Sequence, residues 1–258
     1  MEVLNLSGKT ALVFGIANRW SIAYAIADCL HAQGIRLAVT YQNDRVKDEV
    51  YKLTSAWQEV IHLPCELTDD AQVDAVRDQV QAAWGQLNYL IHCVAFAERE
   101  DLQDPFRNIS RRGFHTAMDI SAYSLIAVAQ RLAPLMPAGD SSILTLTYLA
   151  SERVVPNYNV MAIAKAALEN SVRYLANDLG PLGIRVNAIS AGPIRTASAR
   201  AVAGFTSMLK QYGEKTPLRR NVTAEEVGKA ALYLCSDLSS GVTGTVHFVD
   251  AGYHILGL

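Results

Sequence analysis

The feature that most constrains the fold of this chain is a series of short apolar segments, most of which do not alternate with polar residues. Strands with one face in water alternate apolar and polar side chains. Segments without that alternation therefore predict strands buried on both faces, as in a parallel sheet. There are seven such segments: Thr10–Phe14, Arg36–Thr40, Glu59–Leu63, Tyr89–Val94, Ser142–Thr147, Arg185–Ser190 and Thr245–Asp250.

Longer segments with a helical pattern separate these strands. They are Ser21–Gln33, Asp44–Trp57, Asp70–Trp84, a long stretch ending near Leu135, Asn157–Leu179 and Ala224–Ser236. Strand alternating with helix predicts right-handed βαβ units. We therefore expect a single α/β domain over residues 1–258, with a Rossmann-type doubly wound parallel sheet of about seven strands flanked by helices.

Composition excludes several classes of protein. Half of the 258 residues are hydrophobic, which is enough to form a core and rules out a disordered chain. No stretch approaches the roughly 18 uninterrupted apolar residues of a membrane-spanning helix. The net charge of -2 argues against a nucleic acid or an anionic membrane as partner.

The cysteines and the N-terminal residues bear on metal binding and location. The four cysteines are scattered, with no CxxC pair and no histidine at metal-ligand spacing, so we expect no metal site. The first ten residues resemble neither a signal peptide nor a transit peptide. We therefore expect a cytoplasmic protein with its thiols reduced.

The first strand and helix have the geometry of a phosphate-binding turn. The strand ends at Gly15 and the helix begins near Ser21, which directs backbone N–H groups toward a pyrophosphate. Only one of the three usual glycines is present, so this pattern alone does not identify a dinucleotide site. Ser21 either donates its hydroxyl to a phosphate or caps the helix, and the two roles are compatible.

Residues after the second and third strands bear on which dinucleotide would bind. Gln42 occupies the place where an acidic residue that binds ribose is expected. Gln42 can bond ribose hydroxyls and offers no positive charge to a 2′-phosphate, which favours NADH, while the nearby Arg45 leaves NADPH open. Glu66 either faces an adenine edge or is an ordinary acid at a helix entry.

Tyr148, Tyr158 and Lys165 are the strongest candidates for chemistry. Tyr148 ends the fifth strand, and the seven residues from Tyr158 to Lys165 place both on one helix face, about 10 Å apart along the axis. Lys165 lies among alanines, where a solvated lysine is out of place. A cation beside a phenol is expected to lower the pKa of the phenol, which would let Tyr158 offer its proton to a developing oxyanion.

The segment from Ala197 to Lys215 follows Gly192-Pro193 and is rich in small residues. Its composition fits one more surface helix somewhat better than a mobile lid over a site.

Six motifs spread over nearly the whole chain resemble the short-chain dehydrogenases/reductases, and specifically the bacterial enoyl-(acyl-carrier-protein) reductases. They are GIANRWSIAYAIA at Gly15–Ala27, TYQND at Thr40–Asp44, the RxxPNYNVMxxAK pattern ending at Lys165, RYLAN at Arg173–Asn177, RVNAISAGPIRT at Arg185–Thr196 and LCSDLSSGVTG at Leu234–Gly244. Ordinary superfamily members carry a tyrosine four residues before the lysine and a serine about thirteen residues before that tyrosine. Met161 and Tyr148 occupy those two positions here.

The resemblance implies reduction of a trans-2-enoyl thioester by NADH, rather than NADPH, in the last step of the fatty-acid elongation cycle. It implies that Tyr158 hydrogen-bonds the thioester oxygen, that Lys165 holds the nicotinamide ribose, and that Tyr148 shapes the pocket and takes part in the proton path. The implied cofactor residues are Gly15, Ser21, Ile22, Gln42, Glu66, Leu67, Val94, Lys165, Ile194, Thr196 and Ser198. The implied substrate residues are Ala97, Tyr148, Tyr158, Met161 and Phe205.

The resemblance also identifies residues of about 195–212 as a substrate-binding flap, in place of the plain helix. It implies an acidic acyl-carrier protein as partner. Basic residues near the flap form either a docking face for that partner or scattered solvated cations: Arg195, Arg200, Lys210, Lys215, Arg219 and Arg220. The resemblance implies a homotetramer, in which the long alanine-rich segments Met118–Leu135 and Met161–Leu179 and the apolar C-terminus lie at subunit contacts. Two other functions stay open: a short-chain carbonyl reductase of the 3-oxoacyl type, and a non-catalytic NAD(P)-sensing protein.

Overall fold

The computed structural model describes residues 6–103, 105–196, 199 and 204–257. Seven parallel strands form one sheet in the order β3-β2-β1-β4-β5-β6-β7. The strands are β1 (Thr10–Phe14), β2 (Arg36–Tyr41), β3 (Ile61–Pro64), β4 (Tyr89–His92), β5 (Ser141–Thr147), β6 (Ile184–Ala191) and β7 (Val246–Val249). The expected doubly wound parallel sheet is thus confirmed, and each strand end lies within two residues of the prediction.

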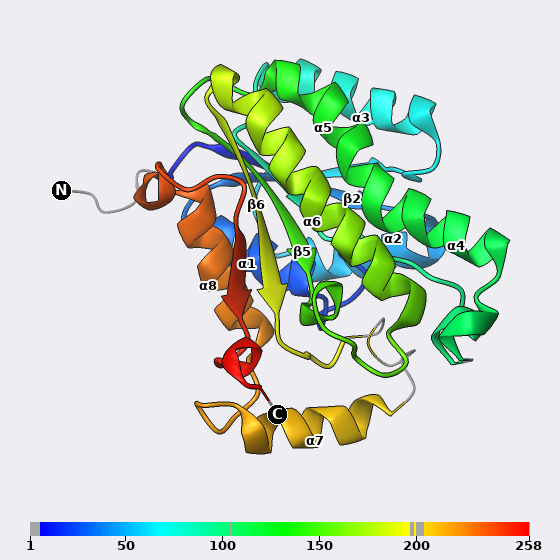
Figure 1. The fold of residues 1–258 in the computed structure, drawn as a ribbon. Coiled ribbons are helices and arrows are strands. Elements are labelled where there is room, and N and C mark those ends of the chain that lie inside the picture. Colours follow the sequence, from blue (N-terminus) through cyan, green and yellow to red (C-terminus); the bar gives the residue numbers. More distant parts are fainter. Residues whose placement is uncertain (1–5, 104, 197–198, 200–203, 258) are drawn as a thin grey trace.

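Helices cover both faces of the sheet (Figure 1). They are α1 (Ile22–His31), α2 (Asp44–Thr54), α3 (Asp70–Trp84), α4 (Arg111–Met118), α5 (Ser124–Leu132), α6 (Asn159–Leu179), α7 (Phe205–Lys215) and α8 (Ala224–Cys235). The long helix predicted to end near Leu135 is in fact interrupted, because a turn of π-helix at Asp119–Tyr123 separates α4 from α5. Such turns are frequent at functional sites.

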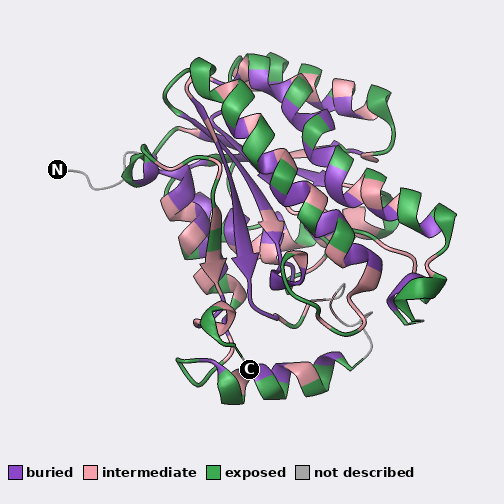
Figure 2. Ribbon diagram, in the orientation of Figure 1, coloured by how far each residue is buried: buried purple, intermediate pink, exposed green. Residues whose placement is uncertain are grey.

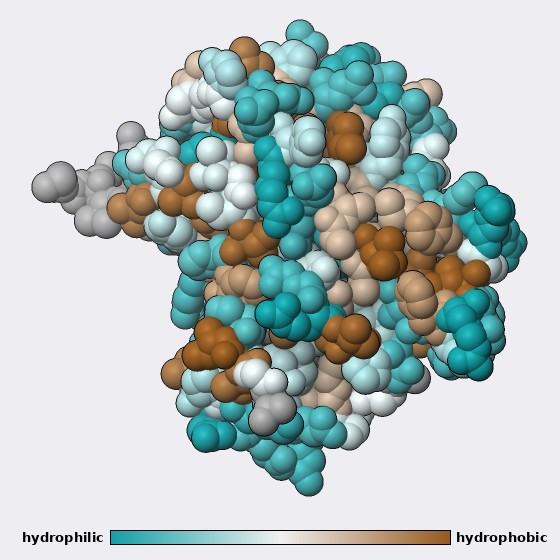
Figure 3. Space-filling view, in the orientation of Figure 1, coloured by the Kyte–Doolittle hydropathy of each residue, from teal (hydrophilic) through white to brown (hydrophobic). Residues whose placement is uncertain are grey.

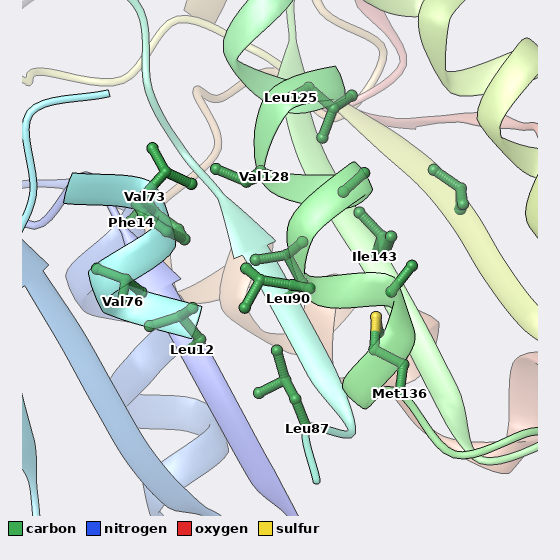
Figure 4. Packing of buried hydrophobic residues seen from close by; sticks show 14 of the residues in the cluster. Leu12, Phe14, Val73, Val76, Leu87, Leu90, Leu125, Val128, Met136 and Ile143 are labelled. Atoms are coloured by element: carbon green, nitrogen blue, oxygen red, sulfur yellow. The ribbon is translucent and has the colours of Figure 1, made fainter. Parts of the chain in front are cut away.

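Alternate residues of each strand supply the two halves of the core. In β1, Leu12 and Phe14 face α3 and α5, whereas Ala11 and Val13 face α1 and α8. Figure 4 shows the first half, with Leu90 and Ile143 of the neighbouring strands packed against the same helices. Figure 2 shows the central strands buried along most of their length. Burial on both faces explains why the strand segments lack polar alternation.

All seven strands run in the same direction, so their carboxyl ends lie at one edge of the sheet. Beyond that edge, α7 lies near the C-terminus (Figure 1). The chain leaves β1 toward β2 on one side, and crosses after β3 to β4 on the other side of β1. The crevice between β1 and β4 is therefore the switch point at which ligands bind in sheets of this kind.

Gly15 and Cys93 meet at this switch point. Gly15 has a φ of +99°, and a Cβ atom there would lie 2.1 Å from the carbonyl oxygen of Cys93. A non-glycine side chain would be opposed both by its backbone conformation and by this contact. The backbones that follow β1 and β4 can therefore approach each other only because residue 15 is glycine.

We predict that Gly15→Ala lowers the free energy of unfolding by about 2–4 kcal/mol, because it combines an unfavourable φ with a backbone clash. Gly85→Ala is the matched control. Gly85 has a φ of +71° but nothing within 4 Å of the added Cβ, so we expect a loss of about 1 kcal/mol. Urea unfolding of both variants measures the difference. Equal losses would show that the contact with Cys93 is relieved by a small backbone shift.

Candidate active site

The turn after β1 is organised around the hydroxyl of Ser21. Its oxygen accepts hydrogen bonds from the backbone N–H groups of Ala17 (3.1 Å) and Asn18 (3.0 Å). Ser21 occupies the N-cap position of α1 but makes no side-chain capping bond. A serine hydroxyl has two lone pairs and one hydrogen. The two accepted bonds use both lone pairs, so the hydroxyl can offer its hydrogen to a phosphate oxygen.

Gln42 and Glu66 lie together at the ends of β2 and β3. The Gln42 side-chain amide donates to the Glu66 carboxylate at 2.6 Å. The carboxylate also accepts from the backbone N–H and hydroxyl of Thr68, so Glu66 orders the entry to α3 as an ordinary helix-entry acid would. With its nitrogen bound in this way, the Gln42 amide presents an oxygen that can accept from a ribose hydroxyl. A 2′-phosphate would instead face the Gln42 acceptor oxygen and the Glu66 carboxylate, both of which are unfavourable neighbours for an anion.

The other predicted cofactor residues also follow strand ends. Leu67 and Val94 follow β3 and β4 and pack against the half of the core that contains Phe14, whereas Ile22 and Ile194 pack against the other half. Thr196 lies after β6, where its hydroxyl accepts from the backbone N–H of Ala199 at 3.1 Å. Ser198 lies outside the described residues.

Two residues with a left-handed backbone conformation flank Tyr158 at the start of α6. Asn157 and Asn159 have φ values of 66° and 40°. Asparagine adopts positive φ more readily than other residues with a side chain, which suits it to both positions. Between them Tyr158 occupies the N-cap position, where the chain turns from the 149–157 loop into the helix.

Lys165 is buried two turns further along α6. Only 5% of its surface is exposed, and its ammonium donates to the carbonyl oxygen of Leu146 in β5 at 2.8 Å. Burial lowers the pKa of Lys165 to about 8, while the Cys93 thiol and the Glu169 carboxylate act in the opposite direction. Glu169 is itself buried and accepts a 2.6 Å hydrogen bond from Thr147. Sequence reasoning missed Glu169, although its place four residues after Lys165 is a readable signal.

The expectation that Lys165 lowers the pKa of Tyr158 is wrong for this structure. Burial raises the pKa of the Tyr158 phenol, and the Lys165 ammonium bonds to Leu146. Tyr158 therefore keeps its proton at neutral pH. Such a phenol suits the role of a hydrogen-bond donor to a developing negative charge.

Apolar side chains gather beside Tyr158. Met161 packs with Leu102 and Val160, and Ala97 and Tyr158 pack against this cluster, so three of the predicted substrate residues are brought together. Ser121 of the π-helical turn ties the neighbouring loop in place, because its hydroxyl bonds both backbone groups of Phe96 at 2.9 Å.

Phe205 is buried at the first residue of α7. It belongs to neither of the two clusters of described residues that contact Tyr158.

Tyr148 has neighbours that sequence reasoning did not identify. Its hydroxyl lies 2.8 Å from that of Tyr212 and 3.5 Å from the Met208 sulfur. Both residues are in α7, where Phe205, Leu209 and Tyr212 form the buried face. The i, i+4, i+7 spacing of those three residues is the signal that could have revealed this face.

The proposed cationic docking face is partly neutralised within the chain. Arg220 forms an ion pair with Glu226 at 2.6 Å, and Lys210 lies 4.0 Å from Glu214. Arg219 donates to the Glu214 carbonyl at 2.7 Å, and Arg200 lies outside the described residues. These contacts favour the interpretation as scattered surface cations.

In the described part of the chain, no three or more His, Cys, Asp or Glu side chains are grouped so that they could hold a metal ion. No helix in that part combines the length and the apolar character needed to cross a membrane. Cys29, Cys65, Cys93 and Cys235 are all free thiols.

Comparison with known proteins identifies the family. A family model described as enoyl-(acyl carrier protein) reductase matches residues 15–254. The chain belongs to this family. The NADH enoyl-(acyl-carrier-protein) reductase of a Nostoc species is 51% identical to it over 259 residues, covering 99% of this chain and 100% of the relative.

Solved structures agree with this assignment. A crystal structure of the Bacillus cereus enoyl-acyl carrier protein reductase with NADP+ and indole naphthyridinone superimposes with a TM-score of 0.95 and 52% identity, covering 98% of this chain and 99% of that one. The enzyme of Anaplasma phagocytophilum in complex with NAD superimposes with a TM-score of 0.93 and 43% identity, covering 98% and 94%.

The lowered pKa of Lys165 predicts the pH dependence of the reaction. Because burial disfavours the charged form, the amine loses its proton near pH 8. If its charge is needed, kcat/KM falls about tenfold per pH unit above that value. Arginine stays charged throughout this range, so Lys165→Arg should have a lower kcat/KM without the falling limb. A wild-type profile that stays flat to about pH 9.5 would contradict the requirement for a charged Lys165.

Proposed function

We propose that this chain reduces trans-2-enoyl-(acyl-carrier protein) thioesters to acyl-(acyl-carrier protein) with NADH, in the last step of the fatty-acid elongation cycle. The observation that carries the proposal is the pairing of the buried Tyr148 with the half-buried Tyr158 beside the carboxyl ends of the strands. The centroids of the Tyr148 and Tyr158 rings lie 4.9 Å apart. The buried Lys165 bonds to the Leu146 carbonyl of β5, the strand that Tyr148 follows. The high identity to NADH enoyl reductases over nearly the whole chain supports the same reaction.

The residues at the switch point fit a dinucleotide. Gly15 leaves room for close backbone approach, and the Ser21 oxygen accepts from two N–H groups of the turn, which leaves its hydrogen available to a phosphate. Gln42, with Glu66 behind it, would bind the adenosine ribose and favours NADH over NADPH. The remaining contacts would come from Ile22, Leu67, Val94, Ile194, Thr196 and Ser198.

NADH, when bound, supplies the hydride that adds to the β-carbon of the enoyl thioester, and addition of a proton at the α-carbon then gives the saturated thioester. Tyr158 would donate a hydrogen bond to the thioester oxygen and stabilise the enolate charge that develops there. Lys165 would hold the nicotinamide ribose hydroxyls and add positive potential, and Tyr148 would take part in the proton path. Ala97 and Met161 form the apolar wall beside Tyr158. Phe205, the buried first residue of α7, would contact the acyl chain further from Tyr158. Residues of about 195–212 would act as the substrate-binding flap, and within this range residues 197–198 and 200–203 lie outside the described residues.

The two alternative functions are not favoured. A carbonyl reductase of the 3-oxoacyl type would need a tyrosine and a serine where this chain has Met161 and Tyr148. Met161 is buried in an apolar cluster and offers no acidic proton. A non-catalytic NAD(P)-sensing protein would have no need of a buried Lys165 or of the Tyr148 and Tyr158 pair.

We predict that Tyr158→Phe lowers kcat for crotonyl thioester reduction by about 10²–10³, because it removes one hydrogen-bond donor to the enolate oxygen. The phenylalanine ring preserves the packing, so the NADH Kd from fluorescence titration should stay unchanged. The same proteins are assayed with NADH and with NADPH to compare the two cofactors, and with acetoacetyl thioester to compare the two substrates. An unchanged kcat in the variant would refute the role of Tyr158, and wild-type activity only on the acetoacetyl thioester would refute the proposed function.

We also propose that the chain forms a homotetramer. Large apolar side chains remain exposed on the face made by α4, α5, α6 and the π-helical turn: Phe114, Tyr123, Ile126, Ile163 and Tyr174. Figure 3 shows apolar surface gathered over α4 and α6. Exposed apolar patches on a protein of this size mark interfaces, and homo-oligomers bury them by symmetry.

A charge on this face should disrupt the assembly. We expect light scattering to give four chain masses for the wild type and a smaller particle for Ile163→Glu, because association would bury an unpaired carboxylate. Leu182→Glu is the control, since Leu182 is exposed on the 3-10 turn at Gly180–Leu182 beyond α6. A monomeric wild type would refute the tetramer.

We place the reaction in the cytoplasm, with acyl-carrier protein as the partner that presents the substrate. The four free thiols are compatible with a reducing compartment. The substrate assignment follows two relatives, both NADH enoyl-(acyl-carrier-protein) reductases. Activity on carrier-linked enoyl substrate, compared with the short thioester, tests the partner directly.

A further inference from the structure

The hydroxyl of Tyr148 is held by α7, a helix 64 residues away in sequence. The Tyr148 and Tyr212 oxygens lie 2.8 Å apart, which is a normal distance for a hydrogen bond between hydroxyls. The other neighbour of the Tyr148 hydroxyl is the Met208 sulfur at 3.5 Å. A thioether is a weak acceptor, so Tyr212 provides the strong hydrogen bond in this pair of contacts.

Tyr212 is itself fixed from the opposite side. Its ring stacks on that of Tyr253, with centroids 3.6 Å apart and planes 14° from parallel. Tyr253 begins the last turn of the chain, at Tyr253–Ile255. Only 5% of Tyr212 is exposed. Aromatic stacking and burial therefore leave the Tyr212 hydroxyl little freedom.

Tyr148, held by Tyr212, packs directly against Tyr158. Their rings lie 4.9 Å apart at an angle of 57°, and both pack in a cluster with Leu149, Ala150 and Tyr212. The contacts thus run from the C-terminal turn through Tyr212 and Tyr148 to Tyr158, which is the proposed donor to the enolate.

We propose that Tyr212 is a positioning residue for enoyl reduction, which holds the Tyr148 hydroxyl toward α7 and thereby keeps the Tyr148 ring packed against Tyr158. This inference rests on the proposed function. Without the Tyr212 hydroxyl, a buried phenol would be left with a thioether as partner, and unsatisfied buried hydroxyls are costly. The Tyr148 hydroxyl would then rotate toward a better acceptor, and its ring would leave the position that supports Tyr158.

Tyr212→Phe tests the proposal with the smallest change. A cavity of about 430 Å³ lies between α7, the 149–157 loop and the C-terminal turn, and Tyr212 forms part of its wall. A phenylalanine ring keeps this wall and the stack on Tyr253, so the variant loses only the hydroxyl and its hydrogen bonds. Loss of the hydrogen bond between Tyr212 and Tyr148 predicts a decrease of about two- to tenfold in kcat for crotonyl thioester. The KM and Kd for NADH should stay within about twofold of wild type.

A double-mutant cycle separates positioning through Tyr148 from a general structural effect. In a Tyr148→Phe background there is no hydroxyl for Tyr212 to hold. Adding Tyr212→Phe should therefore cause no further decrease in kcat. The matched control is Tyr51→Phe, which removes the hydroxyl of a half-exposed tyrosine on α2 whose ring stacks on His62. That variant should keep the wild-type kcat.

Each result has a definite meaning. Wild-type kcat in Tyr212→Phe, or the same loss with and without the Tyr148 hydroxyl, would overturn the positioning role. Thermal unfolding identifies a folding defect, and the cycle remains decisive in that case because a structural loss would persist in the Tyr148→Phe background. Failure of the proposed function is distinguished at the start, since the wild-type protein would then not oxidise NADH with crotonyl thioester.

Discussion

The structure depends on the burial of one parallel sheet on both faces. Leu12 and Phe14 point to one helical layer and Ala11 and Val13 to the other, so each strand supplies both halves of the core. A parallel arrangement brings all carboxyl ends to a single edge. Every element of the proposed site, from the turn after Gly15 to the start of α6, follows from this geometry.

The edge of the sheet is also where the chain uses unusual local structure. Gly15 has a positive φ against the Cys93 carbonyl, and Asn157 and Asn159 have positive φ on either side of Tyr158. A π-helical turn carries Ser121 to the loop after β4. Departures from regular backbone are costly and are retained where they place functional groups. These particular departures adjoin Gly15, Tyr158 and the loop after β4, which supports the assignment of the site without reference to any relative.

Electrostatics in the site follow from burial more than from pairing. Burial lowers the pKa of Lys165 and raises that of Tyr158, so it brings the amine nearer to neutrality and keeps the phenol protonated. Pattern reasoning placed Lys165 on α6 correctly, whereas Tyr158 is the N-cap residue just before that helix, and it assigned their interaction wrongly. The lysine side chain reaches the Leu146 carbonyl of β5, a contact that depends on how α6 packs on the sheet.

The sequence by itself determined the strands, the layers and the spacing of Tyr158 and Lys165, because apolar periodicity and helical pitch are local properties. It also indicated Gly15, Ser21 and Gln42, because strand ends can be read from the same pattern. Only the tertiary structure decided the contacts of Tyr148 with Tyr212, of Gln42 with Glu66 and of Lys165 with Leu146. These contacts join residues 19 to 64 positions apart. Their geometry is set by the packing of whole elements, which no local pattern encodes.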